Sequence, residues 1–278
     1  MSALLHSTRT QAPVFEVFAS IQGEGAYVGE PQSFVRLRGC PLRCRWCDTP
    51  ASWTLVAEPQ ARIDAVRGTR REAAWATPFQ VACWIAEVEP GAPRTLSITG
   101  GEPLLWPAFI TELRRFVGTR RVHLETAGAH PRALERVLDA VDHISLDLKL
   151  AADLDAPVEL TEVDPSAAGA AHAASEAAPR TRVEWAEARA RCLQLVAERD
   201  ACAKLIVAGG RAPREFDELL ESVAEHAPRV PVIVQPVTPC NSIAAPSEEL
   251  LVALVERARE LDLVVRVVPQ VHKLLGVP

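Results

Sequence analysis

Residues 38–50 read RGCPLRCRWCDTP, and they place Cys40, Cys44 and Cys47 in the spacing C-x3-C-x2-C. Thiolates this close together on one loop can occupy three corners of a compact iron–sulfur cube. Three protein ligands leave one iron free to bind a substrate or a cofactor. A zinc knuckle, with a histidine or Asp48 as its fourth ligand, is the alternative that the spacing alone leaves open.

The composition of the 278-residue chain is that of a globular protein that acts on a small molecule. Its hydrophobic content of 48% is sufficient for a large buried core. Thirty basic and thirty-six acidic side chains give a net charge of −6, which argues against a nucleic-acid partner. Because no apolar run has the length of a signal peptide or a membrane span, we expect a cytoplasmic location and no membrane partner.

Cysteine and lysine are distributed unevenly. The crowding of three cysteines into one loop favours metal ligation over a disulfide framework. The other cysteines are scattered, and we expect them to be ordinary small hydrophobes: Cys83, Cys192, Cys202 and Cys240. Lysine is rare beside arginine, so its three positions are informative: Lys149, Lys204 and Lys273.

Short β-rich segments alternate with amphipathic helical patterns, which is typical of an α/β fold with a mainly parallel sheet. The expected strands are Ser33–Arg38, Thr95–Thr99, Arg121–Thr126, His143–Lys149, Cys202–Val207, Val230–Gln235 and Leu263–Val268. Pro107–Val117 has an apolar helical face, and a second helix is expected after a cap at Ser247.

Two stretches interrupt this alternation. Residues 55–77 are charged and lack periodicity, while residues 151–181 are rich in Ala, Pro, Asp and Glu. We expect both to be insertions into a single domain that spans residues 1–278. The second is expected to be dispensable for the chemistry.

The segment Gly100-Gly101-Glu102-Pro103 directly follows one of the expected strands. Two glycines allow the backbone to approach a ligand closely, and a carboxylate beside them can accept hydrogen bonds from an ammonium group. An amino acid would satisfy both features. Taken alone, the segment is also compatible with a simple strand-to-helix turn.

Together, the cysteine spacing and GGEP resemble the radical S-adenosylmethionine (SAM) superfamily, whose cysteines bind a 4Fe–4S cluster and whose GGE motif holds the SAM amino group. Residues 15–50, FEVFASIQGEGAYVGEPQSFVRLRGCPLRCRWCDTP, resemble the 7-carboxy-7-deazaguanine synthases. ETAG at 125–128, Gln235-Pro236 and VHKLLGVP at 271–278 extend the resemblance to nearly the whole chain outside the two insertions. It implies a partial (β/α) barrel of the radical SAM type with inserted loops.

The resemblance implies substrate-binding roles for Gln22, Glu24, Arg36, His272 and Pro278. Arg36 would face the substrate carboxylate, and His272 with the C-terminal carboxylate of Pro278 would close the pocket. Thr49 matches the family's magnesium-binding threonine, and Asp48 could orient a metal-bound water. From residue chemistry alone, Arg36 could equally be a surface residue of a strand, His272 a structural histidine, and Asp48-Thr49-Pro50 a turn.

The resemblance further implies SAM-binding roles for Gly100, Gly101, Glu102, Thr126, Ser145, Lys149 and Gln235. All lie at or just beyond the C-terminal ends of expected strands, where barrel-like folds assemble their sites. Residues 145–149 read SLDLK where the family commonly has a shorter Ser-Pro-Lys. The register of Ser145 and Lys149 therefore stays open.

The implied reaction begins when the reduced cluster cleaves SAM to methionine and a 5′-deoxyadenosyl radical. The radical, rather than a catalytic side chain, takes the hydrogen at C6 of 6-carboxy-5,6,7,8-tetrahydropterin. Ring contraction with loss of ammonia then gives 7-carboxy-7-deazaguanine, and Mg²⁺ would orient the substrate and stabilise charge. The resemblance also implies a homodimer and an electron donor such as flavodoxin or ferredoxin.

Two other functions remain open at the level of sequence. A glycyl-radical activating enzyme shares the cysteine spacing but needs a groove for a protein loop. A zinc-stabilised interaction protein would contain zinc in place of iron and sulfide, so metal analysis distinguishes it from an enzyme of this type.

Overall fold

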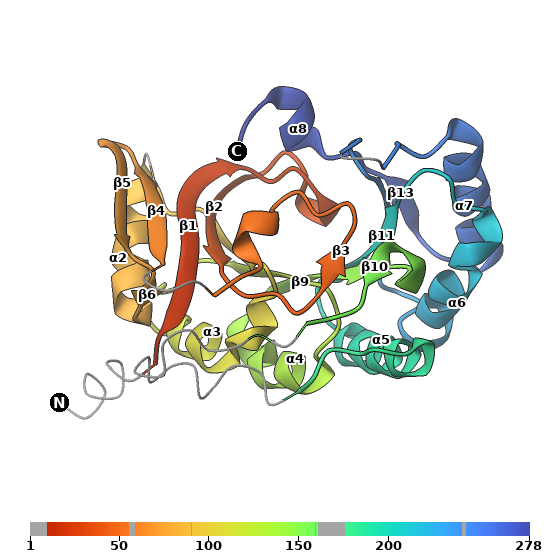
Figure 1. The fold of residues 1–278 in the computed structure, drawn as a ribbon, viewed down its shortest axis with the longest axis horizontal. Coiled ribbons are helices and arrows are strands. Elements are labelled where there is room, and N and C mark those ends of the chain that lie inside the picture. Colours follow the sequence, from red (N-terminus) through yellow and green to blue (C-terminus); the bar gives the residue numbers. More distant parts are fainter. Residues whose placement is uncertain (1–9, 56–58, 90, 159, 161–175, 241–242) are drawn as a thin grey trace.

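A computed structural model describes residues 10–55, 59–89, 91–158, 160, 176–240 and 243–278. An 11-stranded sheet in the order β13-β12-β11-β9-β8-β7-β2-β1-β4-β5, with β6 paired to β1, curves into a partial barrel (Figure 1). Its strands are β1 (Ala12–Ile21), β2 (Pro31–Leu37), β4 (Gln60–Ala65), β5 (Gly68–Ala73), β6 (Trp75–Ala76), β7 (Thr95–Gly100), β8 (Val122–Thr126), β9 (His143–Leu148), β11 (Ala201–Val207), β12 (Val232–Pro236) and β13 (Val265–Val267).

In the part of the sheet that runs in the order β2-β7-β8-β9-β11-β12-β13, each strand is parallel to the next. β1 pairs antiparallel with β2 and parallel with β4. β13 and β5 form the two ends of the sheet, so the barrel is not closed. The expected α/β partial barrel is thus confirmed. All seven expected strands are present, with ends within two residues of those predicted.

Helices cover the outer face of the curved sheet, with α3, α4 and α5 side by side and α6 and α7 continuing the arc (Figure 1). The helices are α2 (Pro78–Val88), α3 (Pro107–Leu113), α4 (Pro131–Val137), α5 (Arg182–Val196), α6 (Asp217–His226), α7 (Glu248–Glu260) and α8 (Val271–Leu275). Ser247 caps α7 as predicted, by accepting a hydrogen bond from the backbone of Leu250. No helix in the described part of the chain has the length and apolar character needed to cross a membrane.

The expected helix Pro107–Val117 ends earlier, at Leu113, and residues 114–116 form a turn. Val117 is buried all the same. The apolar pattern therefore predicted burial correctly and helix length incorrectly, because a turn can bury the same face.

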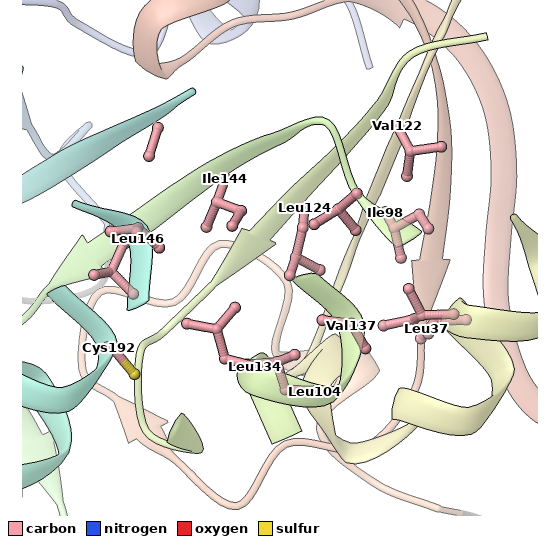
Figure 2. Packing of buried hydrophobic residues seen from close by; sticks show 14 of the residues in the cluster. Leu37, Ile98, Leu104, Val122, Leu124, Leu134, Val137, Ile144, Leu146 and Cys192 are labelled. Carbon is pink, nitrogen blue, oxygen red and sulfur yellow. The ribbon is translucent and has the colours of Figure 1, made fainter. Parts of the chain in front are cut away.

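Side chains alternate along the parallel strands between an apolar outer face and a polar inner face. Outward residues such as Leu124 and Ile144 pack against Leu134 and Val137 of α4 (Figure 2). At the next positions inward lie polar groups, among them Ser97, His123, Ser145, Lys204 and Gln235, all of them buried. Parallel strands covered on both faces are usually apolar throughout, so this polar lining marks the inside of the barrel as the place of function.

Both predicted insertions contain structure that the sequence did not indicate. Residues 60–76 form β4, β5 and β6, which extend the sheet beyond β1. β5 is an exposed, charged edge strand, so its composition resembles that of a loop.

Residues 153–158 are attached to the cysteine loop. β10 (Leu154–Asp155) pairs with β3 (Arg43–Cys44), and the backbone N–H of Val158 donates to the carbonyl of Pro41 at 2.9 Å. These residues of the second insertion thus pair with the cysteine loop, and the expectation that the stretch 151–181 is dispensable for the chemistry stays a prediction. Residues 159 and 161–175 of the same stretch lie outside the described part of the chain.

Candidate active site

A cavity of about 1180 Å³, solvent at its mouth included, opens at the C-terminal ends of the parallel strands. The cysteine loop, the inner residues of β8, β9, β11 and β12, and the C-terminal segment all contribute to its walls. The predicted residues that line it are Gln22, Glu24, Arg36, Cys40, Cys44, Cys47, Thr49, Gly100, Gly101, Thr126, Lys149, Gln235, His272 and Pro278.

The cysteine loop is held by backbone hydrogen bonds. The N–H of Cys40 donates to the carbonyl of Trp53, and the guanidinium of Arg43 donates to the carbonyls of Cys40 and Leu42, at 2.7 Å each. Burial raises the pKa of the Cys40 thiol, and that of the Cys44 thiol to about 11, so a bound cation is needed to hold either as a thiolate.

Gly100 and Gly101 allow the end of β7 to pass directly against the strand that leads into the cysteine loop. A Cβ at Gly101 would lie 2.2 Å from the carbonyl oxygen of Gly39, and one at Gly100 would lie 2.3 Å from that of Leu37. Gly100 also has a φ of 145°, which favours glycine. The two glycines therefore set the distance between the cysteine loop and β7.

Glu102 does not line the cavity, although its neighbours do. Its carboxylate is fully buried and accepts hydrogen bonds from the N–H of Leu104, the hydroxyl of Thr126 and the N–H of Ala127, at 2.7–3.0 Å. In this structure it therefore fixes the ends of β7 and β8, and it positions Thr126 and Ala127, which do reach the cavity.

The N-terminal part of the cavity wall is formed by the loop after β1. Buried Gln22 donates from its amide to Glu125 Oε1 at 3.1 Å and accepts from the N–H of Glu24. Burial would raise the pKa of Glu24, but the ammonium of Lys204, with Gln270 and Gln235, lowers it below its usual range. Glu24 is thus a permanent anion at neutral pH.

Arg36 is on the inner face of β2 and reaches the cavity next to Phe18 and Phe34. Its Nε donates to Glu16 Oε1 at 2.8 Å, and about one fifth of each side chain is exposed. The guanidinium keeps free donors on its other nitrogens. It is therefore available to a ligand carboxylate while it stays oriented by Glu16.

The C-terminal segment closes one side of the cavity. The N–H of Val271 donates to the carbonyl of Gly23 at 2.9 Å, and the hydroxyl of Ser20 donates to the carbonyl oxygen of Pro278 at 2.7 Å. A Cβ at Gly23 would overlap the ring of His272, since it would lie 2.0 Å from Nδ1. Glycine in the QGEG element is therefore needed for His272 to pack here.

A set of potential cation ligands meets at the cavity mouth. Ligand atoms of Glu24, Asp48 and His272 all lie within 4.8 Å of one another. Thr49 is adjacent, and its hydroxyl donates to Asp48 Oδ1 at 2.8 Å. Carboxylate and hydroxyl oxygens are ligands that suit a small divalent cation such as Mg²⁺.

Ser145 lies below the cavity rather than on its wall. Its hydroxyl contacts His123 Nε2 at 2.8 Å and Cys202 Sγ at 3.3 Å. Asp147, two residues further along the same face of β9, takes its place at the cavity, and Lys149 follows. Of the two residues whose register the sequence left open, Lys149 reaches the cavity and Ser145 does not.

Sequence reasoning missed four charged or polar groups of the site: Glu125, Asp147, Lys204 and Gln270. Lys204 Nζ lies 2.8 Å from Glu24 and 2.9 Å from Asp147, and Lys149 Nζ lies 2.5 Å from Asp147. The rarity of lysine was the available signal, because Lys149 and Lys204 line the cavity and Lys273 lies 3.5 Å from cavity-lining Asp48.

Comparisons with known proteins agree with this geometry. The model of the Radical SAM superfamily matches residues 34–162. The crystal structure of QueE from Escherichia coli superposes with a TM-score of 0.57 at 20% identity, covering 96% of this chain and 98% of that one. A radical SAM methyltransferase from Sphaerobacter thermophilus gives a TM-score of 0.55 at 14% identity, covering 86% of this chain and 66% of that one. The fold and the cysteine-lined cavity are those of a radical SAM enzyme, which uses a 4Fe–4S cluster and SAM.

Relatives of known activity narrow this class. The chain is 33% identical over 275 residues to the 7-carboxy-7-deazaguanine synthase of Methanothermobacter thermautotrophicus, covering 96% of this chain and 98% of the relative. It is 32% identical to the enzyme of the same name from Geobacter sulfurreducens, covering 95% and 97%. The chain belongs to the 7-carboxy-7-deazaguanine synthase family. This membership excludes the glycyl-radical activating enzyme and the zinc-stabilised interaction protein.

Proposed function

We propose that this enzyme converts 6-carboxy-5,6,7,8-tetrahydropterin to 7-carboxy-7-deazaguanine with the help of Mg²⁺. The observation that carries the proposal is the lining of one cavity by two sets of residues: the cysteine loop with Gly100 and Gly101, and the charged side chains of Glu24, Glu125 and Arg36. The first set suits SAM on a cluster. The second suits a small ligand that carries both N–H donors and a carboxylate.

On the cofactor side, Cys40, Cys44 and Cys47 would bind the cluster, since their thiols line the cavity and have no disulfide partner. When bound, the cluster and SAM supply the one-electron chemistry that the chain itself lacks. The SAM-binding residues in this proposal are Gly100, Gly101, Thr126, Lys149 and Gln235, with Glu102 and Ser145 acting from behind the wall. The Oε1 atom of Gln235 is buried and without a hydrogen-bond partner, which leaves it available to a ligand donor.

On the substrate side, the anionic Glu24 and the amide of Gln22 would accept and donate hydrogen bonds to the pterin ring, and Arg36 would hold its carboxylate. His272 and Pro278 would cover the ring and exclude water. Thr49, with Asp48 beside it, would bind Mg²⁺, which orients the substrate carboxylate and stabilises charge.

Two partners complete the proposal. A flavodoxin or ferredoxin would reduce the cluster. A second copy of the chain would form a homodimer, and exposed apolar residues around β13 and α8 offer a surface for it: Val264, Val267, Leu274 and Leu275.

The test is turnover by the reconstituted enzyme. Anaerobically reconstituted protein supplied with SAM, a reductant, Mg²⁺ and the carboxypterin should release ammonia and a product with the mass and ultraviolet spectrum of 7-carboxy-7-deazaguanine. The same mixture with the pterin lacking its carboxyl group is the matched control and should give no ring-contracted product. Cleavage of SAM with no deazapurine formed from the carboxypterin would overturn the proposed substrate.

A further inference from the structure

Lys204 is buried in the floor of the cavity, at a position to which the family resemblance assigned no role. It lies on the inner face of β11, and its side chain is 3% exposed. Its Nζ atom lies 2.8 Å from Glu24 Oε2, 2.9 Å from Asp147 Oδ1 and 3.7 Å from Glu125 Oε2. One ammonium group therefore meets three carboxylates from three separate elements: the loop after β1, β8 and β9.

The three carboxylates differ in how much they depend on this lysine. Asp147 has a second cation, because Lys149 also pairs with it. Within the described part of the chain, Glu24 and Glu125 have no cation other than Lys204 within 4.0 Å. Neutral groups provide their remaining hydrogen bonds. The amides of Gln270 and Gln235 bond to Glu24, and the hydroxyl of Ser97 and the amide of Gln22 donate to Glu125.

Lys204 also sets the direction of these side chains. An ammonium group has three donors, so one lysine can orient three acceptors at once. Lys204 thus orients Glu24 and Glu125, which both line the cavity.

We propose that Lys204 is a positioning residue that orients the carboxylates of Glu24 and Glu125 as acceptors, so that the cavity selects a ligand whose edge carries several N–H donors. The amino and ring N–H groups of a carboxypterin form such an edge. Lys204 touches neither the reacting carbon nor the cluster in this scheme. The inference rests on the proposed function and adds to it the residue that sets its selectivity.

The experiment compares Lys204→Met and Lys204→Arg with the wild-type holoenzyme. Steady-state KM and kcat for the carboxypterin are measured, and the rate of SAM cleavage is measured without pterin. Methionine removes all three donors, so Glu24 and Glu125 lose the group that orients them. We expect KM to rise 10-fold to 100-fold, with a smaller change in kcat, because the altered carboxylates contact the ligand edge and not the reacting carbon.

Arginine retains the charge but cannot place three donors at the same points, since its donors lie in a planar fork. Lys204→Arg should therefore raise KM several-fold, less than Lys204→Met does, and it carries the test if Lys204→Met does not fold. SAM cleavage without pterin should stay within about twofold in both variants. Arg120→Met is the matched control, because it breaks the buried ion pair with Glu89 outside the cavity. It should lower thermal stability and leave KM unchanged.

Two outcomes would overturn different parts of the argument. If the wild type does not convert the carboxypterin, the proposed function fails and the inference fails with it. If the wild type does convert it, and the folded Lys204 variants have KM values within twofold of the wild type, only the role of Lys204 is wrong. A KM increase of the same size in Arg120→Met would also reduce Lys204 to a merely structural residue.

Discussion

The inside of the barrel has two levels, built by the same strands but opposite in electrostatic character. The upper level, which lines the cavity, contains Glu125, Asp147 and Lys204. The lower level lies two residues earlier on each strand and contains His123, Ser145 and Cys202, one each from β8, β9 and β11. Strand register keeps the levels aligned, since Ser145 pairs with Cys202 and Asp147 with Lys204 across β9 and β11.

Charge distinguishes the two levels. In the upper level, burial is compensated by ion pairs, so that carboxylates and ammonium groups stay ionised and face the ligand. In the lower level, His123 has no ion pair within the described part of the chain. Its pKa is well below the usual range, mainly because the ring is buried and secondly because positive charges lie nearby. The lower level is thus a neutral, hydrogen-bonded floor under a charged site. The charged upper level is suited to binding a ligand. The neutral lower level avoids the cost of buried charges that have no partner.

The largest expected effect concerns the cysteines, which occur at both levels. Replacing Cys40, Cys44 and Cys47 together with alanine should abolish cluster binding and SAM cleavage, because these thiols line the cavity and can ligate iron. The matched control is Cys202→Ala in the lower level, which should retain the cluster. Iron and sulfide analysis with visible absorbance measures both. A full cluster in the triple variant, or its loss in Cys202→Ala, would show that the division between the levels is wrong.

A smaller effect is expected where the upper level is closed by backbone contact. In Gly101→Ala the new Cβ would lie 2.2 Å from Gly39 O and 2.9 Å from the Cβ of Cys40, so the cysteine loop must shift. A displacement of about 1 Å at a reacting centre can lower the rate about 100-fold. We expect SAM cleavage, measured as 5′-deoxyadenosine formed per cluster, to fall by about this factor. Gly91→Ala should have normal rates, because a Cβ there meets no atom within 4 Å.

The sequence predicted the parallel strands because their outer faces are continuous apolar stripes, and it predicted most of the cavity wall because motif residues end those strands. The sequence did not predict how far below the cavity each inner residue of a strand lies. Ser145 and Lys149 are on the same inner face of β9, but a separation of four residues places one below the cavity and the other in it. Depth depends on how far neighbouring strands extend, which no local pattern encodes.

Other omissions have local physical reasons. β1 was not predicted as a strand, because its residues were interpreted as part of a motif and because its buried residues do not alternate along it, the register being shifted between Val14 and Glu16. The hairpin of β4 and β5 is charged on its exposed side and reads as a loop. The SAM-binding role of Glu102 stays a prediction, and what the sequence did not show is that three donors from the chain contact its carboxylate. A sequence shows that a carboxylate is present, and only the fold shows what it binds.

The smallest expected effect is on the pH dependence of stability, and it tests the neutrality of the lower level directly. His123 is buried with a pKa far below the ordinary value of 6.5, so it stays neutral in the folded protein while the unfolded chain takes up a proton. Its contribution to stability is therefore fully present above pH 6.5 and is lost as the pH falls, by about 1.4 kcal/mol per pH unit.

Glutamine at this position can still bond to Ser145 and does not titrate. Between pH 6.5 and pH 5, His123→Gln should lose about 2 kcal/mol less unfolding free energy than the wild type, whatever its stability at neutral pH. Urea denaturation at several pH values measures this difference. His130, whose pKa burial lowers to about 4, remains in both proteins and provides the common slope against which the difference is read. A constant difference between the two proteins over this pH range would mean that His123 is protonated in the fold, and that the lower level is charged like the upper one.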